Sequence, residues 1–223
     1  MYKFIFKNVE VITLSSLLNY DIENIYNKAP FVLANGIKLE PVATLEPNKN
    51  KRTLLFLSNL IKAKGILIFI DAIEQVLNEN ANFKVKIVGN SGDVSIEEVR
   101  RIVADKNLQS YVEVLGPKYG SDKEKILLNA NILVLPTVFE NECFPLVILE
   151  AMAKGLLIIS TKVGAIPEIV QDGINGKVIE KPNVQFLKKA ILDCIKMEDF
   201  ELQAIRVRNI QKFKDNYLSL IHI

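Results

Sequence analysis

Short apolar segments alternate with amphipathic segments along most of this 223-residue chain. Short apolar runs are typical of buried parallel strands, whereas apolar residues spaced by three or four positions are typical of helices. The pattern predicts strands at 53–57, 83–88, 111–115, 132–136, 156–160 and 177–179. It predicts helices from residue 65 to about 77, after 95, after 121, from 145, and over 166–171, 183–197 and 199–218.

Strands that alternate with helices at this spacing favour right-handed βαβ units. We therefore expect a doubly wound α/β domain with a mostly parallel, Rossmann-like sheet, from about residue 30 to 195. The N-terminal part has a weaker pattern, with strands at 9–14 and 30–33 and a weak helix over 15–27. Residues 40–52 are mostly polar and include two prolines, so we expect a loop there.

Composition places the chain among globular proteins, with 49% apolar and 24% charged residues. A net charge of +2 with dispersed lysines argues against nucleic-acid binding. The two cysteines, Cys143 and Cys194, suit a reducing cytosol, and no apolar run approaches the roughly 18 residues that cross a bilayer. We expect a cytoplasmic protein, with peripheral association at the inner membrane face left open. His222 is the only histidine, which excludes an internal histidine base.

Four loops follow the carboxyl ends of predicted strands, at 58–65, 89–92, 116–119 and 137–145. The carboxyl ends of parallel strands share one edge of the sheet, so these loops form one rim of a crevice. Their glycine, proline and small polar residues suit a phosphorylated ligand that meets a helix N-terminus. The residues alone predict a nucleotide or phosphate binder. A Walker A loop and a Gly-x-Gly-x-x-Gly opening are absent, which disfavours a dinucleotide dehydrogenase.

The segment from Glu142 to Gly155 joins one of these loops to a helix. Pro145 lies in the first helical turn, where its missing N–H removes no helical hydrogen bond. Gly155 stands where a C′ glycine ends a helix. Glu142 lies in the loop and Glu150 inside the helix, so two carboxylates flank the helix N-terminus.

The run Glu-Cys-Phe-Pro-Leu-Val-Ile-Leu-Glu-Ala-Met-Ala-Lys-Gly resembles the Glu-x7-Glu signature of the retaining group-1 (family-four) glycosyltransferases of GT-B fold. Other segments resemble this family in its order, at 58–60 with 64–65, 87–89, 114–116, 130–132 and 164–170. Residues 11–15 and 33–37 resemble the linker between the two domains of the family. The resemblance covers nearly the whole chain.

The resemblance implies a role for each matching residue. Glu150 would accept hydrogen bonds from the ribose of a nucleoside-diphosphate sugar, and Glu142 would lie near the transferred sugar. Lys64 would neutralise the leaving diphosphate, without a metal ion or other cofactor. We assign Glu142 and Lys64 as catalytic. The amides around Phe144 and Leu146 would meet the diphosphate and sugar, and the remaining donor-binding positions would be Asn59, Gly89, Gly116 and Lys118.

Two positions depart from the family pattern. Asn59 stands where many members have arginine, which leaves Lys64 alone or with Lys62 to balance the phosphate charge. Pro145 stands where glycine is frequent, and it removes one amide donor from the loop.

The resemblance also implies a domain organisation. Residues 1–29 would be a remnant of an N-terminal domain and linker, 30–197 the nucleotide-sugar-binding domain, and 198–223 a helix that crosses back to the N-terminal domain. That acceptor-binding domain is the part of the family that we expect this chain to lack. Partners would be a nucleotide-sugar, a glycan or lipid-linked sugar acceptor, and an N-terminal-domain partner. Residues 9–14 and the last helix are expected to expose apolar surface, which favours self-association.

Several alternatives remain open on the sequence alone. Glu142 and Glu150 could be solvated acids at a helix start or a hydrolytic acid/base pair, and Lys64 could be an ordinary surface lysine. Glu168 could be a cap, a core support or a ligand contact. The principal hypothesis is the donor-binding domain of a retaining glycosyltransferase in cell-surface glycan or polysaccharide synthesis. A non-catalytic sugar-nucleotide-binding fragment and a GT-B-type epimerase are the alternatives.

Overall fold

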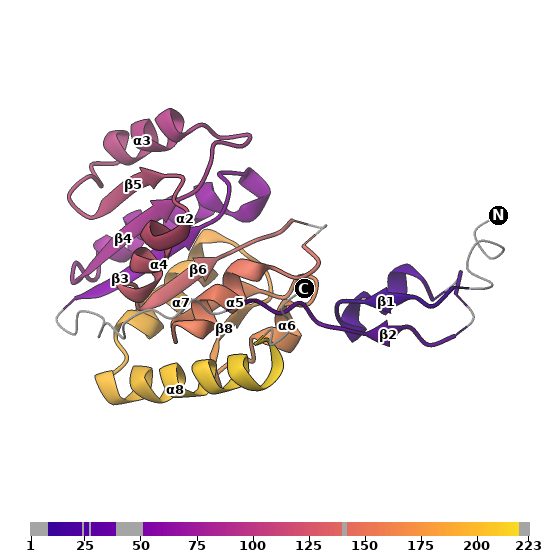
Figure 1. Ribbon diagram of the computed structural model, residues 1–223. Helices are drawn as coiled ribbons and strands as arrows, with labels where there is room; N and C mark the ends of the chain where they lie inside the picture. Colours follow the sequence, from indigo (N-terminus) through magenta and orange to yellow (C-terminus); the bar gives the residue numbers. More distant parts are fainter. Residues whose placement is uncertain (1–8, 24, 27, 39–50, 140–141, 219–223) are drawn as a thin grey trace.

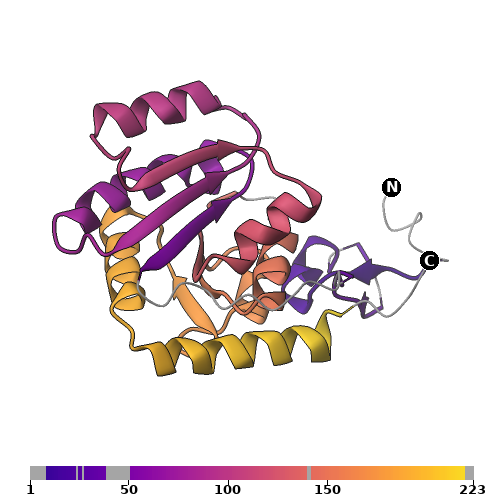
Figure 2. The same ribbon diagram turned by 60° about the vertical axis from the view of Figure 1, so that its left-hand side comes forward.

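The computed structural model describes residues 9–23, 25–26, 28–38, 51–139 and 142–218. Its main body is a six-stranded parallel sheet with helices on both faces (Figures 1 and 2). The strands are β3 (Arg52–Leu57), β4 (Phe83–Val88), β5 (Val112–Gly116), β6 (Ile132–Leu135), β7 (Leu157–Thr161) and β8 (Gly176–Ile179). The helices are α2 (Ile66–Leu77), α3 (Ile96–Asp105), α4 (Gly120–Leu128), α5 (Leu146–Ala153), α6 (Ile166–Ile169), α7 (Val184–Ile195) and α8 (Asp199–Asn216).

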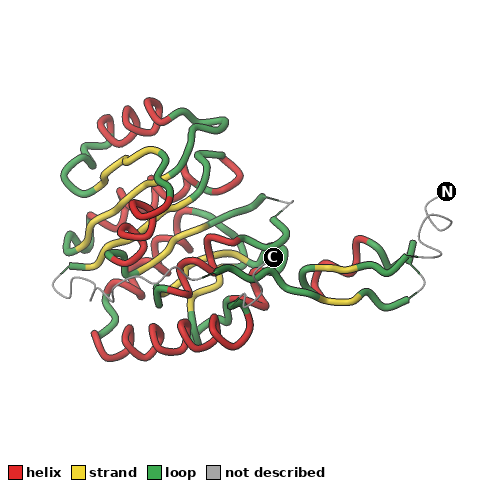
Figure 3. Tube along the Cα trace, in the orientation of Figure 1, coloured by secondary structure: helices red, strands yellow, loops and turns green. Residues whose placement is uncertain are grey.

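The strand order across the sheet is β5-β4-β3-β6-β7-β8, and every neighbouring pair is parallel. The order reverses between β3 and β6, the point at which doubly wound sheets bind ligands outside the carboxyl ends of their strands. The predicted doubly wound α/β fold is therefore confirmed, and each strand predicted between residues 53 and 179 is present. Figure 3 shows the alternation of strands and helices along the chain.

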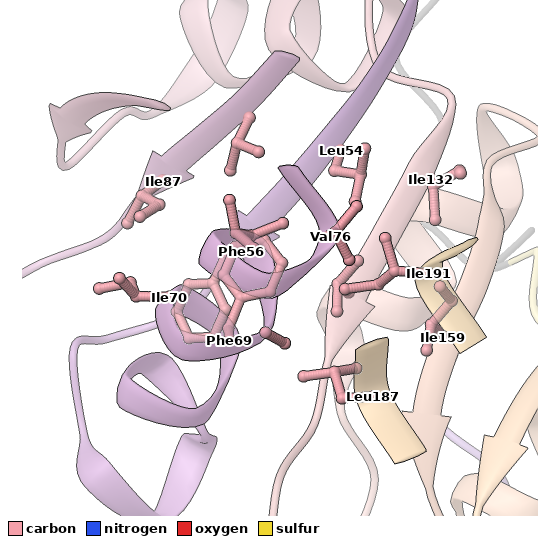
Figure 4. Packing of buried hydrophobic residues seen from close by; sticks show 14 of the residues in the cluster. Leu54, Phe56, Phe69, Ile70, Val76, Ile87, Ile132, Ile159, Leu187 and Ile191 are labelled. Atoms are coloured by element: carbon pink, nitrogen blue, oxygen red, sulfur yellow. The ribbon is translucent and has the colours of Figure 1, made fainter. Parts of the chain in front are cut away.

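Alternate residues of β3 supply the two halves of the hydrophobic core. Leu54 and Phe56 point to the face covered by α2, α3 and α7, where Phe56 stacks on Phe69 with ring centroids 5.7 Å apart (Figure 4). Leu55 and Leu57 point to the opposite face, which is covered by α4, α5, α6 and α8. A strand that is buried on both faces is apolar throughout, which explains why the sequence shows an apolar run and no alternation.

The segment before β3 forms a separate unit beside the main domain (Figures 1 and 2). Its strands, β1 (Ile12–Thr13) and β2 (Phe31–Val32), pair in parallel with each other and lie outside the six-stranded sheet. The doubly wound sheet therefore begins at β3 and not, as predicted, at about residue 30. The longer strand predicted over 9–14 is wrong, because only two residues of β1 find a partner on β2. The weak helix predicted over 15–27 is a 3₁₀ helix, η2 (Ser16–Asp21).

This N-terminal unit exposes the apolar surface that the sequence predicts for residues 9–14. Ile12 is 59% exposed and Phe31 is 66% exposed. A two-stranded sheet is marginally stable by itself, and parallel strands are usually covered on both faces. Most of the loop predicted over 40–52 lies outside the described residues, and Arg52 belongs to β3.

Helix α8 packs on the main domain, against α5 and β7, and its Phe213 is fully buried. The buried Asn209 ties it to the sheet: its Nδ2 donates to the Leu156 carbonyl at 2.7 Å and to the Asn175 carbonyl at 3.0 Å. Its Oδ1 accepts from the Asn175 side chain at 2.9 Å. The described part of the C-terminal helix is thus anchored on its own domain, with Phe200 and Val207 exposed as predicted for this helix. Whether it also meets a preceding domain stays a prediction.

Candidate functional site

A cavity of about 180 Å³ opens at the carboxyl ends of β3 and β4. Four of the predicted donor-binding residues lie in its wall, which is contributed by the loops after β3, β4 and β5 and by helices α4 and α5. The lining residues are Leu57, Ser58, Asn59, Val88, Gly89, Asn90, Pro117, Lys118, Tyr119, Lys123, Val147 and Glu150. Three of the four loops predicted to form the crevice rim thus contribute to this cavity, whereas the loop over 137–145 contributes no lining residue.

Close backbone packing holds the loops after β3 and β4 together. A Cβ atom on Gly89 would lie 1.8 Å from the carbonyl oxygen of Ser58, so only glycine fits there. The amide of Gly89 also donates to the carbonyl of Gly116 at 3.2 Å. Gly116 is not among the cavity-lining residues, so its place at the site is to support Gly89.

Lys64 and Glu142 form an ion pair between the loops after β3 and β6, and neither is among the residues that line the cavity. The side chain of Lys64 is 16% exposed and that of Glu142 is 9% exposed. The Lys64 ammonium also lies 4.6 Å from the ring centroid of Phe139. The sequence places both residues at one edge of the sheet, and the structure brings them into direct contact.

Two glycines make this contact possible. Gly65 has a φ of +85°, and a Cβ there would lie 2.3 Å from the carbonyl oxygen of Pro136. Gly164 has a φ of +53°, and its Cβ would lie 1.7 Å from the carbonyl oxygen of Glu142. The amide of the next residue, Ala165, donates to the Cys143 carbonyl at 3.0 Å. The loop that carries Glu142 is therefore held by close packing against two glycines, Gly65 and Gly164, at which a side chain would clash with backbone.

Glu150 lies one turn inside α5 and pairs with Lys123 of α4 at 2.7 Å. Both side chains are about three-quarters buried, with exposed fractions of 23% for Glu150 and 28% for Lys123. Glu150 was predicted from the sequence, whereas Lys123 was not, because a single lysine on a helix is by default a solvated residue.

The N-terminus of α5 places Phe144 and Leu146 differently. Pro145 is the N-cap, one residue before the helical turn that the sequence predicts for it, and it provides no side-chain hydrogen bond to that turn. Phe144 is buried, and its ring packs edge-on against Tyr217 at a centroid distance of 6.0 Å. Leu146 is 46% exposed. The Phe144 side chain is therefore a core residue, and only its backbone is available for the predicted contact with a diphosphate.

Three more polar residues of the cavity wall, Ser58, Asn90 and Tyr119, lie in loops that the sequence predicts for the crevice rim, but none was assigned as a donor-binding residue. The side-chain amide of Asn90 donates to the Tyr119 hydroxyl at 2.8 Å. Asn90 and Tyr119 follow two different strands, β4 and β5, that are adjacent in the sheet. The position of each after a predicted strand was the available signal, because those positions face the same crevice.

A larger cavity of about 390 Å³ lies at the other end of the sheet, beside the first residues of β3 and β7. Its Arg52 is already paired with Asp199 at 2.7 Å and with the Met197 carbonyl at 2.9 Å.

Within the described residues, no group of three or more histidine, cysteine or acidic side chains is placed to hold a metal ion. Nor does any described helix have the length and apolar character needed to span a membrane.

Glu168 of α6 joins the N-terminal unit to the main domain. Its Oε1 accepts hydrogen bonds from the Ser16 hydroxyl at 2.5 Å and from the Leu17 amide at 3.2 Å. Burial raises the pKa of Glu168, but the hydrogen bonds from Ser16, Ser15 and the Leu17 amide outweigh burial. The net result is a pKa below the ordinary value of 4.5. Glu168 thus bonds the first turn of η2, whose N-cap is Ser15.

This contact should weaken in acid. A carboxylate whose pKa is lowered by folding stabilises the structure above its unfolded pKa, and the stabilisation is lost as pH falls through the folded pKa. We expect hydrogen exchange at the Leu17 amide to accelerate below about pH 4.5, after correction for the intrinsic pH dependence of exchange. In Glu168→Gln the exchange should be fast at neutral pH and show no such transition. A transition that persists in Glu168→Gln would contradict this assignment.

The model of the family described as "Glycosyl transferases group 1" matches residues 51–197. The chain belongs to this family. The matched region runs from the residue before β3 to the end of α7, so it contains the whole six-stranded sheet and the cavity.

Curated relatives of this glycosyltransferase domain are longer proteins. An uncharacterized glycosyltransferase of Methanocaldococcus jannaschii is 33% identical over 177 residues, which are 79% of this chain and 46% of the relative. The N-acetyl-alpha-D-glucosaminyl L-malate synthase of Bacillus anthracis is 26% identical over 185 residues, or 81% of this chain and 46% of the relative. The chain thus spans less than half of the length of these two relatives.

Solved structures confirm that the domain has the Rossmann-like architecture of GT-B glycosyltransferases. A glycosyltransferase from Rickettsia africae superimposes with a TM-score of 0.80 and 19% identity, over 97% of this chain and 62% of that chain. Anabaena HepE, crystallised with UDP and glucose, gives a TM-score of 0.76 and 20% identity, over 94% of this chain and 59% of HepE.

Proposed function

We propose that this chain is the donor-binding part of a retaining glycosyltransferase that uses a nucleoside-diphosphate sugar. The observation that carries the proposal is the largely buried carboxylate of Glu150 in the wall of a cavity at the switch point of the sheet. A carboxylate there can accept both hydroxyls of a ribose, and the diphosphate would then lie toward the N-terminus of α5. Asn59, Gly89 and Lys118 would complete the donor site.

In the proposed reaction, an acceptor hydroxyl attacks the anomeric carbon of the sugar from the face that the diphosphate leaves. The bond between that carbon and the diphosphate oxygen breaks, and the leaving phosphate takes the proton of the acceptor hydroxyl. Negative charge grows on the diphosphate as the bond breaks. Lys64 would stabilise that charge, and Glu142 would hold Lys64 in place and bond the sugar. The chemistry would then need no metal ion.

The proposed domain organisation is the one that the family resemblance implies. Residues 30–197 would bind the donor, residues 1–29 would belong to a linker and preceding domain, and residues 198–223 would return to that domain. The acceptor, a glycan or lipid-linked sugar, would bind mainly to the preceding domain, supplied by a partner chain or by further sequence. We place the protein in the cytoplasm or at the inner membrane face, in cell-surface glycan synthesis.

Titration calorimetry with UDP, GDP and ADP tests the donor site. At least one should bind, and Glu150→Ala should weaken its binding by about 2 kcal/mol, roughly thirtyfold, because hydrogen bonds to a charged acceptor are lost. Glu180→Ala is a matched control, since Glu180 has an 81% exposed side chain outside the cavity. Affinity should be unchanged in that variant. If no nucleotide binds, or if both variants behave alike, the proposed function is wrong.

A binding fragment without its own turnover is the second candidate, and the partial coverage of the relatives favours it. The two candidates give the same result with nucleotide alone. They differ when a nucleoside-diphosphate sugar is supplied: release of free diphosphate by this chain with a glycan acceptor would support the enzyme, and binding without release would support the fragment.

A further inference from the structure

The Lys123–Glu150 ion pair suggests a second contributor to the ribose site. Lys123 lies on α4 and Glu150 on α5, and both line the cavity at the carboxyl end of the sheet. The Lys123 ammonium is 2.7 Å from Oε1 of Glu150. The proposed donor role of Glu150 makes no use of this contact. The question is whether Lys123 only joins two helices or also prepares Glu150 for its ligand.

A second ion pair between the same two elements separates these possibilities. Glu124, next to Lys123 on α4, pairs with Lys154 at the end of α5 at 2.6 Å. Neither of these two residues lines the cavity. The helices are thus already joined by one ion pair outside the cavity, and the additional pair lies where a ligand would bind.

The hydrogen-bonding capacity of the carboxylate leaves room for both partners. An ionised carboxylate has about four lone-pair sites on its two oxygens. Among the described residues, Lys123 is the one side chain that donates to Glu150, and it uses Oε1. Oε2 and the remaining lone pairs can therefore accept the two hydroxyls of a ribose while Lys123 stays bound.

Lys123 would also remove conformational freedom from Glu150. A glutamate side chain has three rotatable bonds, and fixing it before ligand binding lowers the entropy lost on association. The Lys123 ammonium also provides a counter-ion for the largely buried carboxylate of Glu150. Both effects act on Glu150 and on whatever bonds to it, which is the ribose diol and not the base.

We propose that Lys123 is a positioning residue that fixes Glu150 to receive the two ribose hydroxyls, and that it thereby lets the site select ribose over 2′-deoxyribose. The inference rests on the proposed function, because it takes the ligand of Glu150 to be a ribose. It adds Lys123 of α4 to the donor site and predicts that the site discriminates against 2′-deoxyribose.

Calorimetry with UDP, GDP and ADP, each beside its 2′-deoxy counterpart, tests this inference. In the unmodified chain the ribonucleotide that binds should be preferred over its 2′-deoxy form. Lys123→Met should weaken ribonucleotide binding about tenfold but 2′-deoxynucleotide binding about threefold or less, because Glu150 is no longer fixed in the position in which it accepts from the 2′-hydroxyl. The preference should therefore fall at least about threefold. Lys123→Arg, which keeps the charge and the donors, should restore most of it.

Glu124→Gln is the matched control, because it breaks the other ion pair between α4 and α5. It should leave the ribose preference unchanged even if thermal stability falls. Three results would overturn the inference. An equal loss of both nucleotides in Lys123→Met would indicate plain charge attraction to the diphosphate. An unchanged preference would show that Lys123 only joins the helices. Absence of binding in the unmodified chain would refute both the inference and the proposed function, whereas the first two results leave the proposed function standing.

Discussion

Alanine at Gly164 should destabilise the fold by about 3 kcal/mol or more and displace the loop that carries Glu142. The new Cβ would lie 1.7 Å from the carbonyl oxygen of Glu142 and 3.1 Å from that of Cys143, so backbone has to move. The positive φ of +53° adds roughly 1–2 kcal/mol of strain for a residue with a Cβ. For a chain of this size we expect Tm to fall by about 6–12 °C in a calorimetric scan.

Gly173→Ala provides the control for Gly164→Ala. Gly173 has a φ of +73°, but no heavy atom lies within 4 Å of its would-be Cβ. This variant should carry the backbone strain alone, about 1 kcal/mol, and lose roughly 2–4 °C. Equal losses in the two variants would show that the contact between Gly164 and the Glu142 carbonyl does not hold the loop. We also expect weaker nucleotide binding in Gly164→Ala and unchanged binding in Gly173→Ala.

Leucine at Asn209 should lower the free energy of unfolding by about 3 kcal/mol, measured by urea denaturation. Asn209 is fully buried and bonds the Leu156 carbonyl, the Asn175 carbonyl and the Asn175 side chain. Leucine has a similar size but leaves these buried groups with fewer partners, and each unsatisfied group costs about 1–3 kcal/mol. The loss should be accompanied by release of α8, detectable as faster hydrogen exchange along that helix.

Asn216→Leu is the comparison on the same helix. Asn216 is exposed, and its side chain donates to the Lys212 carbonyl one turn earlier at 2.9 Å. Surface substitutions of this kind usually change stability by less than about 0.5 kcal/mol. If Asn209→Leu also loses less than about 1 kcal/mol, the buried amide network is not what anchors α8.

The sequence predicts the six-stranded sheet well because its strands are buried on both faces. β6 and β7 are apolar almost throughout and are bounded by polar or glycine-containing loops. Such runs are typical of strands at the centre of a parallel sheet. The cavity follows from the same logic, since Asn59 and Gly89 stand just beyond β3 and β4 and Glu150 lies one turn inside the helix that follows β6.

The parts that the sequence misses depend on contacts between distant segments. Lys123 and Glu150 are separated by 26 intervening residues along the chain, and neither residue type indicates its partner. In α8 the buried positions are Ile205, Asn209 and Phe213. Because one of these three residues is polar, the spacing of apolar residues does not indicate which face of the helix is packed. The pairing of β1 with β2 rests on two residues in each strand, too few for an apolar period to appear.

The junction after β2 limits how the N-terminal unit can move. The Ile37 amide donates to the Tyr217 carbonyl at 3.0 Å, and Ile37 forms a parallel bridge with Leu218. The chain entering the main domain and the chain leaving α8 therefore lie side by side at one place. The N-terminal unit is also bonded to the main domain through Glu168, which accepts from Ser16 and Leu17. Two separate contacts restrain its orientation more than the covalent link alone would.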